Sequence, residues 1–184
     1  MADVEIGVEY AIVLTTNSGL WSYIIGDTVR FTSLRPHRIR VTGRTAHFLS
    51  AFGEHLIVEE ADAAMTEACR ATGAEIQDYH VAPVYPSAEE ARPMHQWLVE
   101  FIKEPPDRSA FVALLDEHLQ KLNEDYAAHR QGDAGMRPPE LAALPSGTFY
   151  AAMKELGKLG GQHKAPRLKN DREFAEILLK ANRS

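Results

Sequence analysis

The sequence has little cysteine and no long apolar run. Its 184 residues include one cysteine, Cys69, which excludes an internal disulfide. Cys69 follows Met65 and Ala68 on an apolar helical stripe, so we expect a buried, inert thiol and not a nucleophile. No apolar stretch approaches the roughly 20 residues of a membrane-spanning helix, and the acidic N-terminus lacks the core of a signal peptide. We therefore expect a cytoplasmic protein that does not enter a membrane.

The chain also lacks an excess of positive charge. Its formal net charge is -6 and its isoelectric point is near 5.7. The basic residues between Arg35 and Arg44 are spaced like the outward face of strands, whereas binding to nucleic-acid phosphates normally needs a basic face. A nucleic-acid partner is therefore not expected.

Several catalytic motifs are missing. The sequence has no glycine-rich phosphate loop, no Walker-type Gly-Lys-Ser/Thr, no His-Glu-x-x-His, no Cys-x-x-Cys and no Gly-x-Ser-x-Gly. Its eight histidines are scattered without the spacing of metal ligands, so no protein metal site is predicted. These absences exclude a P-loop nucleotidase, a zinc protease of that motif and a serine hydrolase of that motif.

The N-terminal part is rich in strand patterns and has no helix to cover them. Gly26-Asp27 is expected to break one apolar run into two strands, and Thr42-Gly43-Arg44 is expected to end the next. The predicted strands are Tyr10 to Thr15, Leu20 to Ile25, Thr28 to Phe31 and His37 to Val41.

The C-terminal part alternates between helical and strand patterns. Asp107 is a predicted N-cap for the longest helix, and Ser146 for a later, shorter one. The predicted order is a short apolar strand near 47 to 52, helix Leu56 to Thr72, strands Ile76 to Tyr85 and Gln96 to Ile102, helix Asp107 to Arg130, strand Leu141 to Leu144, and two further helices. A β-α-β-β-α-β order favours an antiparallel sheet with both main helices on one face, which is an α+β fold.

The change of pattern predicts two domains. We expect a β-rich segment over residues 1–43 and a small α+β domain with extra C-terminal helices over 46–184. Gly43 tolerates large backbone changes, so Thr42 to Thr45 is the predicted hinge.

Gly26-Asp27 is the most informative pair for chemistry. A carboxylate at a strand end beside glycine is free of side-chain crowding and can accept two hydrogen bonds from a vicinal diol such as a ribose. From the spacing alone, an Asp in a β-turn is the commoner interpretation.

Four ordered segments resemble one family. They are Leu14-Thr-Thr-Asn-Ser-Gly-Leu-Trp-Ser-Tyr-Ile-Ile-Gly-Asp-Thr-Val-Arg30, Gly43-Arg44 with Leu49-Ser-Ala-Phe-Gly-Glu-His-Leu56, Leu144-Pro-Ser-Gly-Thr-Phe149, and Gln162-His-Lys-Ala-Pro-Arg167. They are similar to segments of the Gretchen Hagen (auxin-responsive) acyl-acid amido synthetases, members of the acyl-adenylate-forming superfamily. Ile24 and His55 depart from this pattern, where the family usually has arginine and lysine.

The resemblance implies the C-terminal part of a larger ligase. In that superfamily the phosphate loop and the acyl-acid pocket lie upstream, so residues 1–43 would be the end of a large adenylating domain and 46–184 a mobile lid. The implied reaction joins an acyl acid to an amino acid through an acyl-adenylate, with ATP and Mg²⁺, and this chain alone would be inactive. The implied partners are the acyl acid, the amino acid and the adenylating domain.

The resemblance also implies roles for individual residues. Asp27 would hold the ribose hydroxyls of ATP, Tyr23 would lie beside the nucleotide, and Arg44 would contact the ribose or phosphates. Lys164 would be swung in to contact the reacting carboxylate and the α-phosphate, where a desolvated lysine stabilises developing negative charge. From the residues alone, a solvated loop lysine beside Arg167 and Lys169 is the favoured interpretation of Lys164.

Two alternatives stay open. One is a thioester ligase fragment similar to the acyl-CoA synthetases. The other is a non-catalytic α+β module that docks on a separate large subunit.

Overall fold

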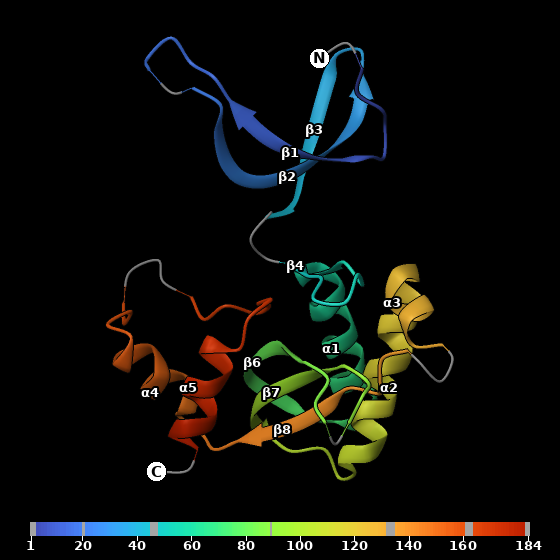
Figure 1. The fold of residues 1–184 in the computed structure, drawn as a ribbon, viewed down its shortest axis with the longest axis vertical. Coiled ribbons are helices and arrows are strands. Elements are labelled where there is room, and N and C mark those ends of the chain that lie inside the picture. Colours follow the sequence, from blue (N-terminus) through green and yellow to red (C-terminus); the bar gives the residue numbers. More distant parts are fainter. Residues whose placement is uncertain are drawn as a thin grey trace. The chain divides into compact units, whose positions relative to one another are not determined.

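A computed structural model describes residues 3–19, 21–44, 48–88, 90–131, 135–160 and 164–182. The chain divides into two compact units, residues 1–47 and 48–184 (Figure 1). The elements are β1 (Glu9–Leu14), β2 (Tyr23–Leu34), β3 (His37–Arg44), β4 (Phe48–Leu49), β5 (Leu56–Ile57), α1 (Val58–Thr72), β6 (Glu75–Val84), β7 (Met94–Lys103), α2 (Arg108–Leu122), α3 (Glu124–His129), β8 (Glu140–Leu144), α4 (Thr148–Glu155) and α5 (Glu173–Ala181). The α+β class expected from the sequence is confirmed.

The first unit is a three-stranded antiparallel sheet in the order β1-β2-β3. Val29 and Phe31 of β2 are its buried apolar residues, and the ring of Tyr10 meets that of Phe31 edge-on at 5.8 Å. Several other large apolar side chains of this unit are exposed, among them Trp21 at 85% and Val41 at 62%.

Two strand boundaries in this unit differ from prediction. Gly26-Asp27 does not separate two strands, because β2 runs through it from Tyr23 to Leu34. Thr42-Gly43-Arg44 does not interrupt the next strand either, since all three residues belong to β3. Residues 42–44 of the predicted hinge therefore lie in a strand, and Thr45 lies outside the described residues.

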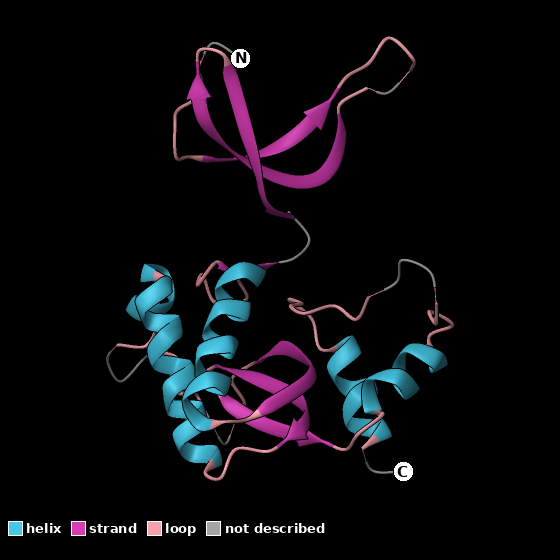
Figure 2. Ribbon diagram, turned by 180° about the vertical axis from the view of Figure 1, so that it is seen from behind, coloured by secondary structure: helices cyan, strands magenta, loops and turns pink. Residues whose placement is uncertain are grey.

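The second unit is built on the sheet β6-β7-β8, which has helices on both faces (Figures 1 and 2). Strands β6 and β7 are antiparallel, whereas β7 and β8 are parallel. The prediction of an all-antiparallel sheet was therefore wrong: the chain crosses back over the sheet through α2 and α3 before it enters β8. The predicted first strand of the motif also stays out of this sheet, because β5 pairs with β4.

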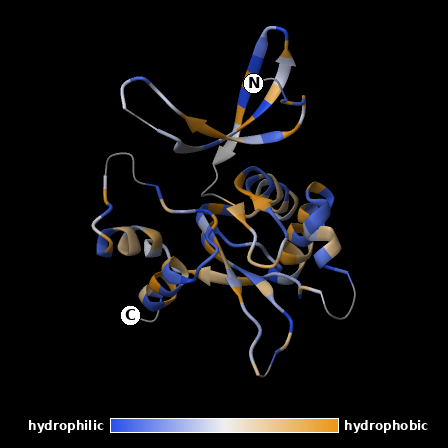
Figure 3. Cartoon of the chain, turned by 45° about the horizontal axis from the view of Figure 1, so that its top comes forward, coloured by the Kyte–Doolittle hydropathy of each residue, from blue (hydrophilic) through white to orange (hydrophobic). Residues whose placement is uncertain are grey.

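Alternate side chains of β6 and β7 build two cores. Tyr79, Val81, Trp97 and Val99 pack with α1 and α2, which confirms that these two helices share one face of the sheet. Leu98 packs on the opposite face with α4 and α5. In Figure 3 the helices carry hydrophobic and hydrophilic residues side by side, as expected for helices with one buried face.

The ends of the long helices follow local rules. Asp107 caps α2 as predicted and accepts hydrogen bonds from the N–H groups of Ser109 and Ala110 at 2.8 and 3.1 Å. The single helix predicted from Asp107 to Arg130 is broken at Asn123, whose extended backbone ends α2 and whose side chain caps α3 at Tyr126 N. Asn123 also donates to Glu60 at 2.8 Å, so a tertiary contact fixes the break.

Candidate functional site

The Gly26-Asp27 pair forms a β-bulge inside β2. The register with β1 steps from Ala11↔Thr28 to Val13↔Ile24, so residues 25–27 of β2 face one residue of β1. A bulge leaves residues unpaired and turns their side chains away from the regular alternation. The expectation of a carboxylate at a strand end is corrected accordingly: Asp27 lies in mid-strand, and the bulge breaks the regular pattern there.

The structure brings two of the implied nucleotide residues opposite each other. Asp27 and Arg44 are register partners in the β2–β3 ladder, and Asp27 is half-buried. The side chain of Arg44 is not among the described parts. Tyr23 opens β2 opposite Leu14 and is 51% exposed. The ladder is irregular next to this pair, where Thr28 and Thr42 approach through their hydroxyl oxygens at 3.3 Å.

Lys164 lies in the second unit, on the rim of a groove of about 830 Å³. The groove runs between α1, strands β6 and β7, the start of α4 and the segment that carries Lys164. Its polar lining includes Asp62, Asp78, Glu100, Lys158, Lys164 and Arg167. Lys164 is exposed, and within the described residues it forms no ion pair. Gln162 and His163, which precede it in the resembling segment, lie outside the described residues.

The floor of this groove holds a buried carboxylate. Glu100 is 4% exposed and accepts hydrogen bonds from the N–H groups of Gly147 and Phe149 at 2.7 and 3.0 Å. The Glu100 carboxylate thereby accepts from N–H groups at the N-terminus of α4 that have no partner within the helix, and its position there suits the helix dipole. Ser146 was predicted to cap this helix, but the N-cap is Gly147 in the left-handed conformation, and Glu100 supplies the acceptor.

Arg167 is held on the other side of the groove. Its guanidinium lies 4.3 Å from the centre of the Tyr79 ring and forms ion pairs with Asp78 at 3.4 Å and Asp62 at 3.9 Å. The Tyr79 hydroxyl donates to Asp62 at 2.6 Å. Burial raises the pKa of the Asp78 carboxyl, against the opposing charge of Arg167.

Sequence reasoning did not assign Glu100, Asp78 or Tyr79 to a site. Part of a signal was available, because Glu100 interrupts an apolar run in a predicted strand. The structure shows that Asp78 is its register partner in the β6–β7 pair. Two charged residues in the middle of neighbouring strands need partners of their own, which here are Arg167 and the start of α4.

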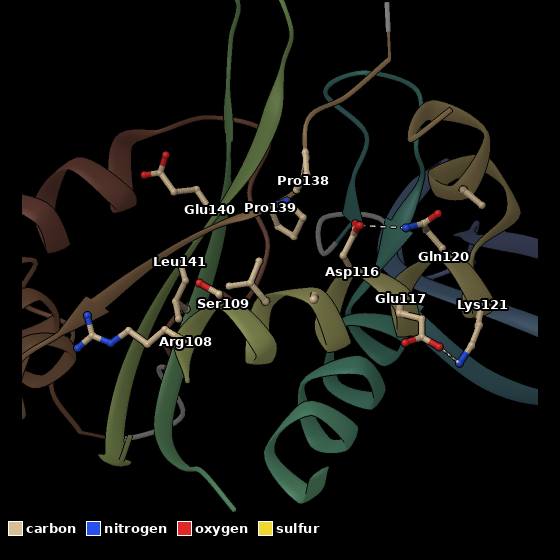
Figure 4. Close-up of a pocket in the computed structure, with 13 residues that line it drawn as sticks. Arg108, Ser109, Asp116, Glu117, Gln120, Lys121, Pro138, Pro139, Glu140 and Leu141 are labelled. Carbon is tan, nitrogen blue, oxygen red and sulfur yellow. Dashed lines mark hydrogen bonds and ion pairs between the residues drawn. The ribbon is translucent and has the colours of Figure 1, made fainter. Parts of the chain in front are cut away.

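A second hollow, of about 810 Å³, lies between α2 and the start of β8 (Figure 4). Several of its polar side chains are engaged with one another: Gln120 donates to Asp116 at 2.9 Å, and Lys121 pairs with Glu117 at 2.5 Å. Asp116 also accepts from Tyr126 and Arg130, so it joins α2 to α3. We assign a structural role to these residues.

The described residues contain no group of three or more His, Cys, Asp or Glu side chains that could hold a metal ion. Nor do these parts of the chain form a helix that is both long and apolar enough to cross a membrane. The sole cysteine is half-buried against the core, and burial raises the pKa of its thiol.

Comparison with known proteins relates both units to one family. The profile of the GH3 family C-terminal domain matches residues 59–173, and that of the GH3 family central domain matches residues 1–44. The chain is 29% identical to the probable indole-3-acetic acid-amido synthetase GH3.4 of Oryza sativa subsp. japonica and 28% identical to the indole-3-acetic acid-amido synthetase GH3.3 of Arabidopsis thaliana. Each alignment covers 97% of this chain, and 30% and 31% of the two relatives.

A solved structure agrees with this relationship. The GH3.15 acyl acid amido synthetase superposes with a TM-score of 0.74 at 25% identity, over 98% of this chain and 34% of that one. The chain thus spans about a third of the length of the relatives that it matches. Because the two family profiles match both units, and that of the C-terminal domain covers more than half of the chain, the chain belongs to the GH3 family.

Proposed function

We propose that this chain supplies the C-terminal part of an ATP-dependent acyl-acid amido synthetase. In the proposed reaction an acyl carboxylate attacks the α-phosphate of ATP to give an acyl-adenylate and pyrophosphate. The amine of an amino acid then displaces AMP and forms an amide. ATP, carried with Mg²⁺, is a substrate in this proposal. The names of the relatives and the match over nearly the whole chain support this reaction class.

The position of Lys164 is the observation that carries the proposal. Its amino group is exposed at the rim of a groove, while the residues that follow it are hydrogen-bonded to β6. A lysine on a fixed backbone can be presented to a phosphate that another domain holds. Its positive charge would stabilise the negative charge that develops on the transferring group.

The first unit would contribute to nucleotide binding. The Asp27 carboxylate, in the β2 bulge, has the chemistry to accept hydrogen bonds from the two ribose hydroxyls. Tyr23 offers an exposed ring four residues earlier on the same strand. Arg44 is the backbone partner of Asp27, which supports a role for its guanidinium near the ribose or the phosphates. The phosphate loop and the acyl-acid pocket would come from the part of the relatives that this chain does not match.

The test uses a hybrid enzyme, defined here as the GH3.15 acyl acid amido synthetase in which this chain replaces the matching third. We expect the hybrid enzyme to catalyse ATP–pyrophosphate exchange that depends on an acyl acid. Asp27→Ala should raise the KM for ATP by about tenfold or more, because a charged acceptor of two hydrogen bonds is lost. Val13→Ala, on the neighbouring strand, is the control and should leave the KM unchanged.

A folded hybrid enzyme without exchange activity would contradict the proposal. An Asp27→Ala variant with an unchanged KM for ATP would contradict the role of Asp27 alone.

A further inference from the structure

The residues after Lys164 lie along the β6 edge of the sheet β6-β7-β8. Strand β6 is an edge strand in the order β6-β7-β8, and Val81 in its middle bridges to Leu168 in parallel. Val81 N–H donates to Arg167 O at 2.8 Å, and Lys169 N–H donates to Val81 O at 3.2 Å. Leu168 is completely buried in the core formed with α1 and α2. We call residues 165–170 the anchored segment.

A buried histidine of β6 is hydrogen-bonded to this segment. His80 is fully buried, and its Nδ1 lies 2.7 Å from the carbonyl oxygen of Pro166. Since a carbonyl oxygen can only accept, Nδ1 carries the proton and donates it. Burial lowers the pKa of His80 to about 4, so the ring is neutral at pH 7 and its other nitrogen is unprotonated. That nitrogen, Nε2, is buried and has no hydrogen-bond partner among the residues that the structure describes, and the ring meets Phe174 edge-on at 5.0 Å.

Asn170 ties the far end of the segment to the beginning of the unit. Its Oδ1 accepts from Ser50 N–H at 2.7 Å, and its Nδ2 donates to Phe48 O at 3.0 Å. The hydroxyl of Tyr85 in turn donates to Asn170 O at 2.9 Å. Phe48 is the first residue of the second unit. The start of the unit and Lys164 are thus connected by six residues and a pair of side-chain hydrogen bonds.

We propose that His80 and Asn170 are positioning residues, which hold the anchored segment so that Lys164 keeps a fixed place relative to the start of the second unit. This inference rests on the proposed function of Lys164. A lysine side chain is flexible, so the accuracy with which its amino group meets a phosphate depends on the backbone that carries it. Displacement of a catalytic group by about 1 Å can cost on the order of 100-fold in rate.

The first experiment measures amide hydrogen exchange on the 184-residue chain itself. His80→Leu removes the donor to Pro166, and Asn170→Ala removes both contacts to residues 48–50. We expect the amides of Lys169 and Ser50 to exchange about tenfold faster in the respective variants, while amides of β7 keep their rates. His80→Asn, whose amide nitrogen can take the place of Nδ1, should restore slow exchange at Lys169.

The control variant is Phe111→Leu, which loosens the core formed with α1 and α2, where Leu168 also lies, but removes none of the hydrogen bonds of the anchored segment. This variant should accelerate amide exchange in α2. The exchange rate of the Lys169 amide relative to the rates of the β7 amides should stay unchanged. Two results would contradict the claim that His80 holds the anchored segment. One is an unchanged exchange rate at Lys169 in His80→Leu. The other is an increase at Lys169 that is no larger than the increase across the whole sheet.

The second experiment uses the hybrid enzyme and separates positioning from stability. His80→Leu and Asn170→Ala should lower kcat for adenylate formation about tenfold or more, with little change in the conversion of a pre-made acyl-adenylate to amide. His80→Asn should recover most of the lost rate. Equal losses in both steps, or none in either, would overturn the positioning role.

The two proposals can fail independently. If Lys164→Ala does not affect adenylate formation, the function of Lys164 is wrong, whereas the exchange measurement on the chain alone still decides whether the anchor exists.

Discussion

His80 and Pro166 are joined across 86 residues of sequence by one hydrogen bond, from the imidazole Nδ1 to the main-chain oxygen at 2.7 Å. The contact spans from the middle of an edge strand to the loop that carries Lys164. When a buried imidazole donates through Nδ1 to a carbonyl, its Nε2 is either unprotonated or protonated and bonded to a second acceptor. Nε2 of His80 has no hydrogen-bond partner within the described part of the chain, and this and the lowered pKa of the ring both agree with the neutral form.

The neutral state of His80 predicts a pH-dependent stability. The pKa of His80 is about 4 in the folded chain, below the ordinary value near 6.5, so the unfolded chain binds more protons between these values. The free energy of unfolding should therefore fall by roughly 3 kcal/mol, through this group, as the pH drops from about 6.5 to about 4. Above pH 6.5 the contribution of His80 should not change with pH. Urea unfolding followed at several pH values measures this loss.

His80→Asn is the control for that measurement, because asparagine does not titrate. Lys169, Asp171 and Arg172, whose charges also act on His80, are unchanged in the variant. Contributions from other groups are common to both proteins and cancel in the difference. Equal acid sensitivity of the wild type and His80→Asn would show that His80 does not titrate as a buried neutral ring.

A second prediction concerns the joint between α2 and α3. Asp116 accepts hydrogen bonds from Tyr126, Arg130 and Gln120, and its side chain is only 12% exposed. Asp116→Ala should destabilise the chain by about 3 kcal/mol, since a nearly buried guanidinium loses its counter-charge. The neighbouring Glu117→Ala removes an exposed pair with Lys121 and should change the unfolding free energy little. Similar effects of the two substitutions in denaturant unfolding would contradict the role of Asp116.

A third prediction concerns nucleotide binding by the chain alone. Asp27 and Tyr23 would contact the ribose side of ATP, but in the proposed function the phosphate loop would come from the part of the relatives that this chain does not match. We expect calorimetric titration of ATP into the isolated chain to give weak binding or none. A micromolar dissociation constant would mean that the chain carries a more complete nucleotide site.

Much of the second unit could be predicted from sequence because its signals are local. The apolar stripes of α1 and α2, the N-cap at Asp107 and the glycine at the end of α1 each act within a few residues. Gly73 takes the left-handed conformation there, which favours glycine over other residues. The strand positions follow from apolar runs in the same way.

The features that were missed depend on partners far away in the sequence. The break at Asn123 is fixed by Glu60 and His55, and the cap of α4 is Glu100, a strand residue 47 positions before Gly147. The parallel pairing of β8 depends on the path of α2 and α3, which short-range patterns do not reveal. Gly26-Asp27 has the composition of a turn, yet the ladders on both sides hold it in the sheet as a bulge.

The residues of the candidate site also fall into those that the sequence indicates and those that only the fold reveals. Family resemblance selected Asp27, Tyr23, Arg44 and Lys164, whose roles stay predictions. The residues that support Lys164 are not apparent in any motif, because His80 and Asn170 act through main-chain contacts that only the fold creates.

The most direct test of the account is the effect of Lys164→Ala on the two half-reactions of the hybrid enzyme. Lys164 is exposed, so the variant should keep the wild-type melting temperature. We expect adenylate formation, measured by pyrophosphate exchange, to slow by about 100-fold or more, the cost of one lost electrostatic stabiliser. Amide formation from a pre-made acyl-adenylate should change much less. Equal losses in both half-reactions, or an unchanged rate of exchange, would contradict the role of Lys164 and with it the proposed catalytic contribution of this chain.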